Sequence, residues 1–173
     1  MDRRSDHGFT LVELISVIAI GALLLTLGAG ALRTYTRAKA LAGARDMVVT
    51  QMRHAQQRTF SEGYPKAFGV RFLKGGTRWD LVRYDAATGL CTVVESHVLT
   101  NGVSISADPA QTEFPESAAA TQCKNAAPNG SGSYEVAFFY ARGTATPGTA
   151  TFLSNGSAKT RSVEVNPATG RVS

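Results

Sequence analysis

Prolines, which interrupt helices, are missing from a long part of this sequence. After Leu32 no proline occurs until Pro65, so a helix can run through the polar segment between them. Cysteines are also few: the chain has two, Cys91 and Cys123, and no histidine pair stands near them. Two isolated cysteines exclude a structural zinc site, which needs four ligands at short spacings.

The residue clusters that mark enzyme sites are missing as well. His7 lies close to the N-terminus, and neither His54 nor His97 has a carboxylate or cysteine nearby at ligand spacing. No G-x-S-x-G nucleophile turn, phosphate-binding loop or EF-hand loop occurs. The sequence therefore predicts no enzyme, no metal and no cofactor.

Charge is nearly absent from one long stretch. The 24 residues from Phe9 to Leu32 contain a single charged side chain, Glu13. A helix of that length rises about 36 Å, enough to cross a bilayer core of about 30 Å. An ionised carboxylate in such a helix is costly in lipid unless a partner neutralises it. The sequence predicts a membrane-spanning helix at 9–32 whose Glu13 needs an opposite charge.

A polar leader of eight residues precedes this helix. It ends at Gly8, and the next residues read Phe-Thr-Leu-Val-Glu. This pattern resembles the class III signal of type IV pilins and pseudopilins. The resemblance implies that a prepilin peptidase cuts after Gly8 and that Phe9 becomes an N-methylated N-terminus. It also implies that Glu13 pairs with the N-terminal amine of a neighbouring subunit, since opposite charges in an apolar bundle offset each other's desolvation.

Two other interpretations of the N-terminus were considered. A secretory signal peptide has an apolar stretch of about 7–15 residues before a small-residue cleavage site. The segment 28–31, Gly-Ala-Gly-Ala, imitates such a site, but the run here is longer and Glu13 is left unexplained. A plain single-pass anchor remains the other alternative.

The positive charge of the chain is unevenly placed. The formal net charge is +5, with +8 in residues 33–83 and −2 in residues 84–173. Arg33, Arg37 and Lys39 follow the apolar run, where they suit lipid headgroups. By the positive-inside rule they favour a cytoplasmic C-terminal side. The processing motif implies the opposite, a single pass through the bacterial cytoplasmic membrane with the N-terminus cytoplasmic and the C-terminal domain outside.

The helix is predicted to continue through residues 33–62. Apolar and small residues recur there at spacings of three and four, with the arginines of the segment largely outside that stripe. The stripe consists of Leu41, Ala44, Val48, Met52, Ala55 and Thr59. An amphipathic helix of this kind needs a sheet to cover its apolar side.

Residues 63–173 read as strands and turns. Alternating apolar residues at 68–72 and 79–83 flank a Gly-Gly turn and predict a β-hairpin. Further strands are predicted around 90–99, 103–105, 134–140, 149–153 and 162–165, and residues 107–133 are predicted to form a long surface loop. A long helix followed only by strands indicates an α+β fold with an antiparallel sheet.

The C-terminal pattern narrows the resemblance. The end of the chain is similar to the GspH/FimT family of pseudopilins and minor pilins. The features that carry this similarity are Gly143-Thr144-Ala145, a hairpin from Gly148 to Gly156, a strand with Arg161 and the closing Thr169-Gly170-Arg171-Val172. With the domain outside the cytoplasm, Cys91 and Cys123 are expected to form a disulfide, worth roughly 3–4 kcal/mol on the chain-entropy model.

The resemblance implies a structural minor subunit of a type II secretion or type IV pilus-like filament, assembled through Glu13. Its partners would be other pilins or pseudopilins, the prepilin peptidase, the inner-membrane assembly platform, membrane lipid, and secreted cargo or DNA. One alternative is a DNA-binding minor pilin using Arg161 and Arg171, although Ser173 stands where a second tail arginine would be expected. Another is a plain membrane-anchored adhesin.

Overall fold

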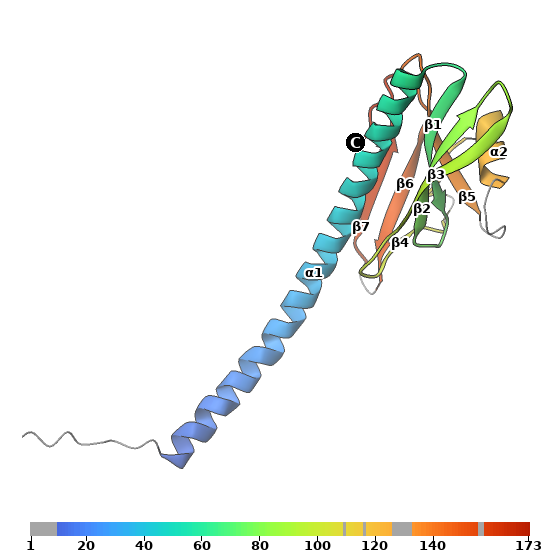
Figure 1. Ribbon diagram of the computed structural model, residues 1–173. Helices are drawn as coiled ribbons and strands as arrows, with labels where there is room; N and C mark the ends of the chain where they lie inside the picture. The colour runs from blue at the N-terminus through green and yellow to red at the C-terminus, as the bar shows by residue number, and fades with distance from the viewer. Residues whose placement is uncertain (1–9, 109, 116, 126–132, 156–157) are drawn as a thin grey trace, which may run out of the picture. The chain divides into compact units, whose positions relative to one another are not determined.

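The computed structural model describes residues 10–108, 110–115, 117–125, 133–155 and 158–173. The chain divides into two compact units between Thr36 and Arg37. One long helix is followed by strands and one short helix (Figure 1). The elements are α1 (Leu11–Glu62), β1 (Lys66–Leu73), β2 (Arg78–Asp85), β3 (Leu90–Val98), β4 (Val103–Ile105), α2 (Ala118–Asn125), β5 (Tyr134–Phe139), β6 (Gly148–Ser154) and β7 (Thr160–Val165).

Helix α1 runs without interruption for 52 residues. It ends at Glu62, where Gly63 adopts a φ of 64° and its amide donates a hydrogen bond to the Thr59 carbonyl at 3.0 Å. A glycine in the left-handed region after the last helical residue is a common helix stop, because it has no Cβ to clash. Gly63 therefore caps the C-terminal end of α1.

The predicted apolar stripe of α1 is confirmed. All six of its residues are buried, and Val48, Met52, Ala55 and Thr59 are fully inaccessible to solvent. The five apolar residues of the stripe pack into one core with side chains of both sheets, among them Phe72 and Phe152. The helix belongs to the fold from residue 37 onward because its amphipathic side supplies part of that core.

The α+β class is confirmed, but the strands form two sheets rather than the one expected. A four-stranded sheet has the order β3-β2-β1-β5, and a three-stranded sheet has the order β4-β6-β7. The predicted hairpin is β1–β2, with Phe72 opposite Trp79. All strand pairs in the described residues are antiparallel. Alternation within a strand does not specify its distant partner, so the division into two sheets was not evident from the sequence.

The prediction of a surface loop at 107–133 is wrong for much of its described part. Helix α2 lies there, on the side of the four-stranded sheet that faces away from α1 (Figure 1). Ser117 begins this helix, since its hydroxyl accepts a hydrogen bond from the Ala120 amide at 3.1 Å. Phe114 and Cys123 are buried. The segment covers a second small core, which the Ala- and Ser-rich composition did not reveal.

Candidate functional site: an apolar helix with one carboxylate

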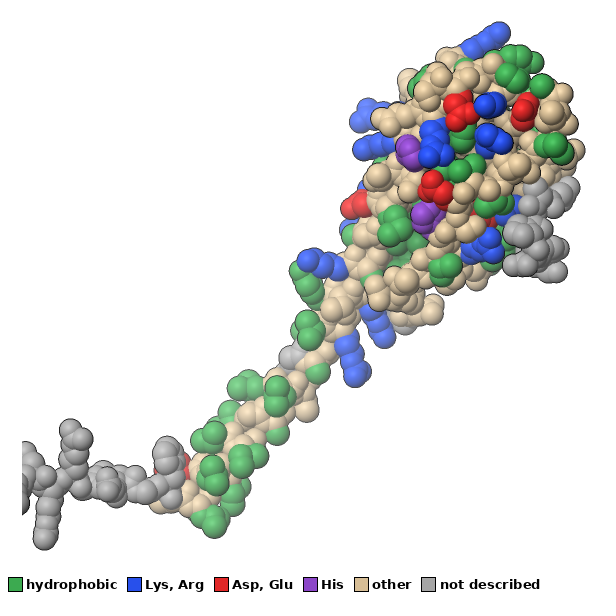
Figure 2. Space-filling view, in the orientation of Figure 1, with side chains coloured by type: hydrophobic (Ala, Val, Ile, Leu, Met, Phe, Trp, Pro, Cys, Tyr) green, Lys and Arg blue, Asp and Glu red, His purple; other side chains and the backbone are tan. Residues whose placement is uncertain are grey.

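The first part of α1 exposes its apolar side chains. Leu11 is 73% exposed and Leu25 76%, and none of the most apolar 18-residue window is buried within the protein. Figure 2 shows these hydrophobic side chains standing out along the N-terminal part of the helix. By length and composition α1 can cross a membrane. Its surface here is suited to lipid or to other apolar helices.

Glu13 lies in the first turn of this helix and is exposed. Its backbone amide donates a hydrogen bond to the Thr10 hydroxyl at 3.2 Å, so Thr10 caps the helix start. The sequence Thr-Leu-Val-Glu has the spacing of a capping box. A carboxylate at this position is favoured by the helix dipole. Within the described residues, no cation forms an ion pair with it.

The proposed processing residues, Gly8 and Phe9, lie outside the described residues. Their roles rest on the sequence pattern alone.

The two C-terminal arginines singled out in the sequence lie beside α1 but not in one cavity. Arg161 lines a polar cavity of about 580 Å³ together with Arg45 of α1. Arg171 lines a second cavity, of about 390 Å³, together with Arg53 of α1. We call the four residues the arginine seam. Arg45 also anchors the helix to β7, since its Nε donates to the Ser162 carbonyl at 3.2 Å.

Arg45 and Arg53 were not selected from the sequence as binding residues. They are eight residues apart on α1, a rise of about 12 Å along one side of the helix. Only the packing of the C-terminal segment against α1 places each of them beside an arginine from the end of the chain.

Comparison with known proteins starts at the N-terminus. Residues 3–29 match the family model of the prokaryotic N-terminal methylation motif. The structure is similar to the minor pseudopilin EpsH from the type II secretion system of Vibrio cholerae, with a TM-score of 0.52 and 14% identity over 80% of this chain and 94% of that chain. This protein carries a prepilin-type N-terminal methylation motif and has the pseudopilin fold. A comparison with curated protein sequences finds no match.

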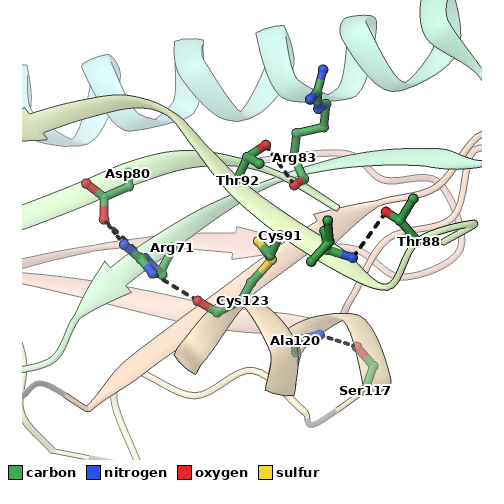
Figure 3. The surroundings of a disulfide bond; sticks show 10 residues. Arg71, Asp80, Arg83, Thr88, Cys91, Thr92, Ser117, Ala120 and Cys123 are labelled. Atoms are coloured by element: carbon green, nitrogen blue, oxygen red, sulfur yellow. Dashed lines mark hydrogen bonds and ion pairs between the residues drawn. A yellow bond between two sulfur atoms is a disulfide. The ribbon is translucent and has the colours of Figure 1, made fainter. Parts of the chain in front are cut away.

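The pilin-like domain holds α2 in place with a disulfide and a buried cation. Cys91 of β3 is bonded to Cys123 of α2, with 5.2 Å between their Cα atoms. Beside this bond, Arg71 donates from Nη1 to the Cys123 carbonyl at 2.9 Å and from Nη2 to Asp80 Oδ2 at 2.7 Å (Figure 3). Its guanidinium also lies over the Tyr134 ring at 4.2 Å. The disulfide and the charge cluster therefore fix one helix to the sheet.

Asp80 and Arg71 are both fully buried. Burial alone raises the pKa of Asp80, but hydrogen bonds from Ser96, Arg71 and Arg78 outweigh it, and the net pKa lies below its usual value. The same hydrogen bond to Asp80 raises the pKa of Arg78. The cluster is thus ionised at neutral pH and fully paired, as a buried charge requires.

The expectation that His97 has no nearby carboxylate is wrong. Its ring stacks on the ring of Trp79, with 4.2 Å between the two ring centroids, and its Nε2 lies 3.4 Å from Glu95 Oε2. His54 is half-buried on α1. Even so, no group of three His, Cys, Asp or Glu side chains that could hold a metal occurs in the described part of the chain.

Proposed function

We propose that the chain is a structural minor subunit, a pseudopilin or minor pilin, of a type II secretion or type IV pilus-like filament. A prepilin peptidase removes residues 1–8, and segment 9–32 spans the bacterial cytoplasmic membrane until assembly. Segment 33–62 continues the helix, and the domain 63–173 lies outside the cytoplasm. Its partners are other pilins or pseudopilins, the inner-membrane assembly platform and membrane lipid. The proposal covers protein secretion and pilus initiation alike.

The observation that carries this proposal is the isolation of Glu13. It is the only charged side chain between Phe9 and Leu32, and it lies on a helix whose apolar side chains are exposed. Lipid supplies no counter-charge at that depth. The N-terminal amine of a neighbouring copy does, so assembly relieves a cost that the single subunit bears.

Substitution of Glu13 tests the proposal. We expect Glu13→Ala and Glu13→Gln to reach the membrane normally, because both remove a charge from an apolar helix. Recovery of either variant with sheared filaments should fall at least tenfold, since a loss of about 1.4 kcal/mol per contact already corresponds to that factor. Membrane fractionation and immunoblotting of the sheared material measure the two quantities.

Ser16→Ala is the matched control. Ser16 lies on the next turn, and its hydroxyl donates a hydrogen bond to the Val12 carbonyl of the same helix. This variant should enter filaments like the unaltered protein. Normal incorporation of Glu13→Ala would remove the carboxylate from the assembly mechanism.

The processing step is tested on the same purified protein. Mass spectrometry of the membrane form should find an N-terminus at Phe9 carrying one methyl group. An uncut N-terminus would favour a plain membrane-anchored adhesin instead.

DNA binding is a second candidate function, and the arginine seam favours it. Two separate cavities each combine an arginine of α1 with one of the C-terminal segment. Within the described residues Arg53, Arg161 and Arg171 form no ion pair. Several cations along one face are the usual requirement for binding a phosphate backbone.

A gel-retardation assay with the full protein in nanodiscs tests this function. Double-stranded DNA should be retarded at low salt, and the affinity should fall steeply as salt rises. Replacing Arg161 and Arg171 together by Ala should abolish retardation, whereas Arg142→Ala, which removes an exposed arginine that lines neither of these two cavities, should not change it. Absence of retardation at every salt concentration would exclude this candidate.

A further inference from the structure

A tyrosine-lined cavity lies at one end of the four-stranded sheet and shares no lining residue with the two cavities of the arginine seam. Its volume is about 490 Å³, within the range of sites that bind small ligands or peptide side chains. It is formed where α1 leads into β1, where β2 and β5 end, and where α2 packs beside them. The walls are mainly alanine and tyrosine, including Tyr64, Tyr84 and Tyr140.

The tyrosines combine apolar faces with free polar ends. Tyr64 is 84% exposed, an unusual position for an aromatic ring without a partner. Tyr84 is held in place by an edge-on contact with Phe138, whose ring centre is 6.3 Å away. In the described residues no hydrogen bond uses the hydroxyls of Tyr64, Tyr84 or Tyr140. The cavity therefore offers aromatic surface together with unused hydroxyl groups.

The charged residues that line the cavity are both basic. Lys66 and Arg142 line it, and no lining residue is acidic. Lys66 is already engaged, since its Nζ lies 3.0 Å from Glu62 Oε2. Arg142 is exposed and forms no ion pair with any described residue. An apolar cavity with one uncompensated cation at its edge complements an apolar group that stands next to a carboxylate.

We propose that this cavity binds an extended segment of a partner protein, taking an apolar side chain between the tyrosines and pairing an adjacent Asp or Glu with Arg142. Sugar sites need several polar side chains to engage hydroxyls, whereas Thr144 is the only uncharged polar residue in the lining apart from the tyrosines. Single-stranded nucleic acid needs a basic track along its backbone, and here only one cation is free. A peptide fits both the apolar walls and the single charge.

This binding site is independent of the filament proposal. It uses residues of the 37–173 unit alone, so a failure of Glu13 to act in assembly would leave it unaffected. Loss of peptide binding would in turn leave assembly through Glu13 intact.

Selection from a peptide library tests the proposal. Phage-displayed random dodecapeptides are selected on the full protein in nanodiscs, after depletion on the Ala141→Trp variant, whose ring fills the cavity. Enriched peptides should carry an apolar residue within three positions of an Asp or Glu. Their synthetic, fluorescein-labelled forms should bind the unaltered protein at least tenfold more tightly than Ala141→Trp or Arg142→Glu in fluorescence anisotropy.

Matched variants separate this site from general effects. Arg161→Glu changes the same charge on the arginine seam and should leave peptide affinity unchanged. Replacing the Asp or Glu of the peptide by Asn or Gln should weaken binding to the unaltered protein. The same replacement should not lower the affinity for the Arg142→Glu variant any further. Ala141 and Arg142 are both exposed, so substitutions there should preserve folding. If circular dichroism shows that the Ala141→Trp variant is unfolded, Ala86→Trp, which is also at an exposed position of the cavity wall, takes its place.

Three results would overturn the proposal. These are a selection without enrichment, peptide affinities equal in all variants, and full displacement of the peptides by a twelve-nucleotide thymidine strand whose own binding is lost in Arg142→Glu. The last result would identify the cavity as a nucleic-acid site.

Discussion

At the scale of single residues, this chain uses charges in two opposite ways. Arg71 and Asp80 are buried and fully satisfied by each other, by Arg78 and by the Cys123 carbonyl. Glu13 is exposed on an apolar helix, and its backbone amide donates a hydrogen bond to the hydroxyl of Thr10, which caps the helix start. A satisfied pair makes the fold specific, whereas an unsatisfied charge calls for a partner.

The buried pair leads to a prediction about pH. Because the pKa of Asp80 is lowered in the folded protein, its ionised form contributes stability above the unfolded value of about 4. That contribution is lost as pH falls through the lower, folded pKa. Asp80→Asn should cost about 3–5 kcal/mol at pH 7 by leaving Arg71 buried without a counter-charge. It should also flatten the decline of unfolding free energy below about pH 5, measured by urea titration at several pH values.

Asp46→Asn is the control for this prediction. The Asp46 side chain is 71% exposed, and its carboxylate lies 3.2 Å from the guanidinium of its neighbour Arg45, so its removal should change stability by less than about 1 kcal/mol. A pH profile of Asp80→Asn parallel to that of the unaltered protein would show that another acid causes the decline.

At the scale of elements, α2 depends on bonds to the sheet more than on its own sequence. It has eight residues, too few for a stable helix in water by itself. Its buried face is small: Ala119, Ala120 and Cys123 pack on Val82, Val136 and Phe138. The disulfide and the Arg71 hydrogen bond supply the remaining attachment.

Removal of the disulfide should therefore affect α2 first. The Cys91→Ser, Cys123→Ser double variant should lose about 3–4 kcal/mol of unfolding free energy, since the bond closes a loop with a sequence separation of 32 residues. Amide hydrogen exchange should become faster in α2, while residues 41–59 of α1 stay protected. The same pattern should follow reduction of the unaltered protein; equal protection of α2 with and without the bond would mean that packing alone holds it.

At the scale of the whole molecule, residues 37–173 contain both hydrophobic cores, whereas the apolar side chains before them are exposed. Every residue of both cores lies at position 40 or later. The apolar window of α1 before that point buries nothing within the protein.

Residues 37–173 alone should then fold cooperatively in water. Their thermal midpoint should lie within about 4 °C of that of the full chain in detergent, because removal of the first 36 residues takes no side chain from either core. Differential scanning calorimetry measures both midpoints. A broad, non-cooperative transition of the shorter chain would show that the N-terminal segment contributes to the core after all.

The sequence by itself determined the long helix, its two chemically different parts and the α+β class. These features depend on local patterns: a run of apolar residues without charge, a period of 3.6 in residues 41–59, and glycine and proline at 63–65. The cysteine pair could also be proposed without coordinates, because only two cysteines are available. The spacing of Thr10 to Glu13 also matches a capping box at the start of α1.

Only the tertiary structure decided how distant segments meet. The division into two sheets, the position of α2 and the burial of Arg71 and Asp80 depend on pairings between segments far apart in the chain, which alternation within each strand does not encode. The same holds for the arginine seam and the tyrosine-lined cavity, whose residues come from segments that are far apart in the chain. Local patterns specify elements, whereas sites arise from packing, because packing alone sets which side chains share one space.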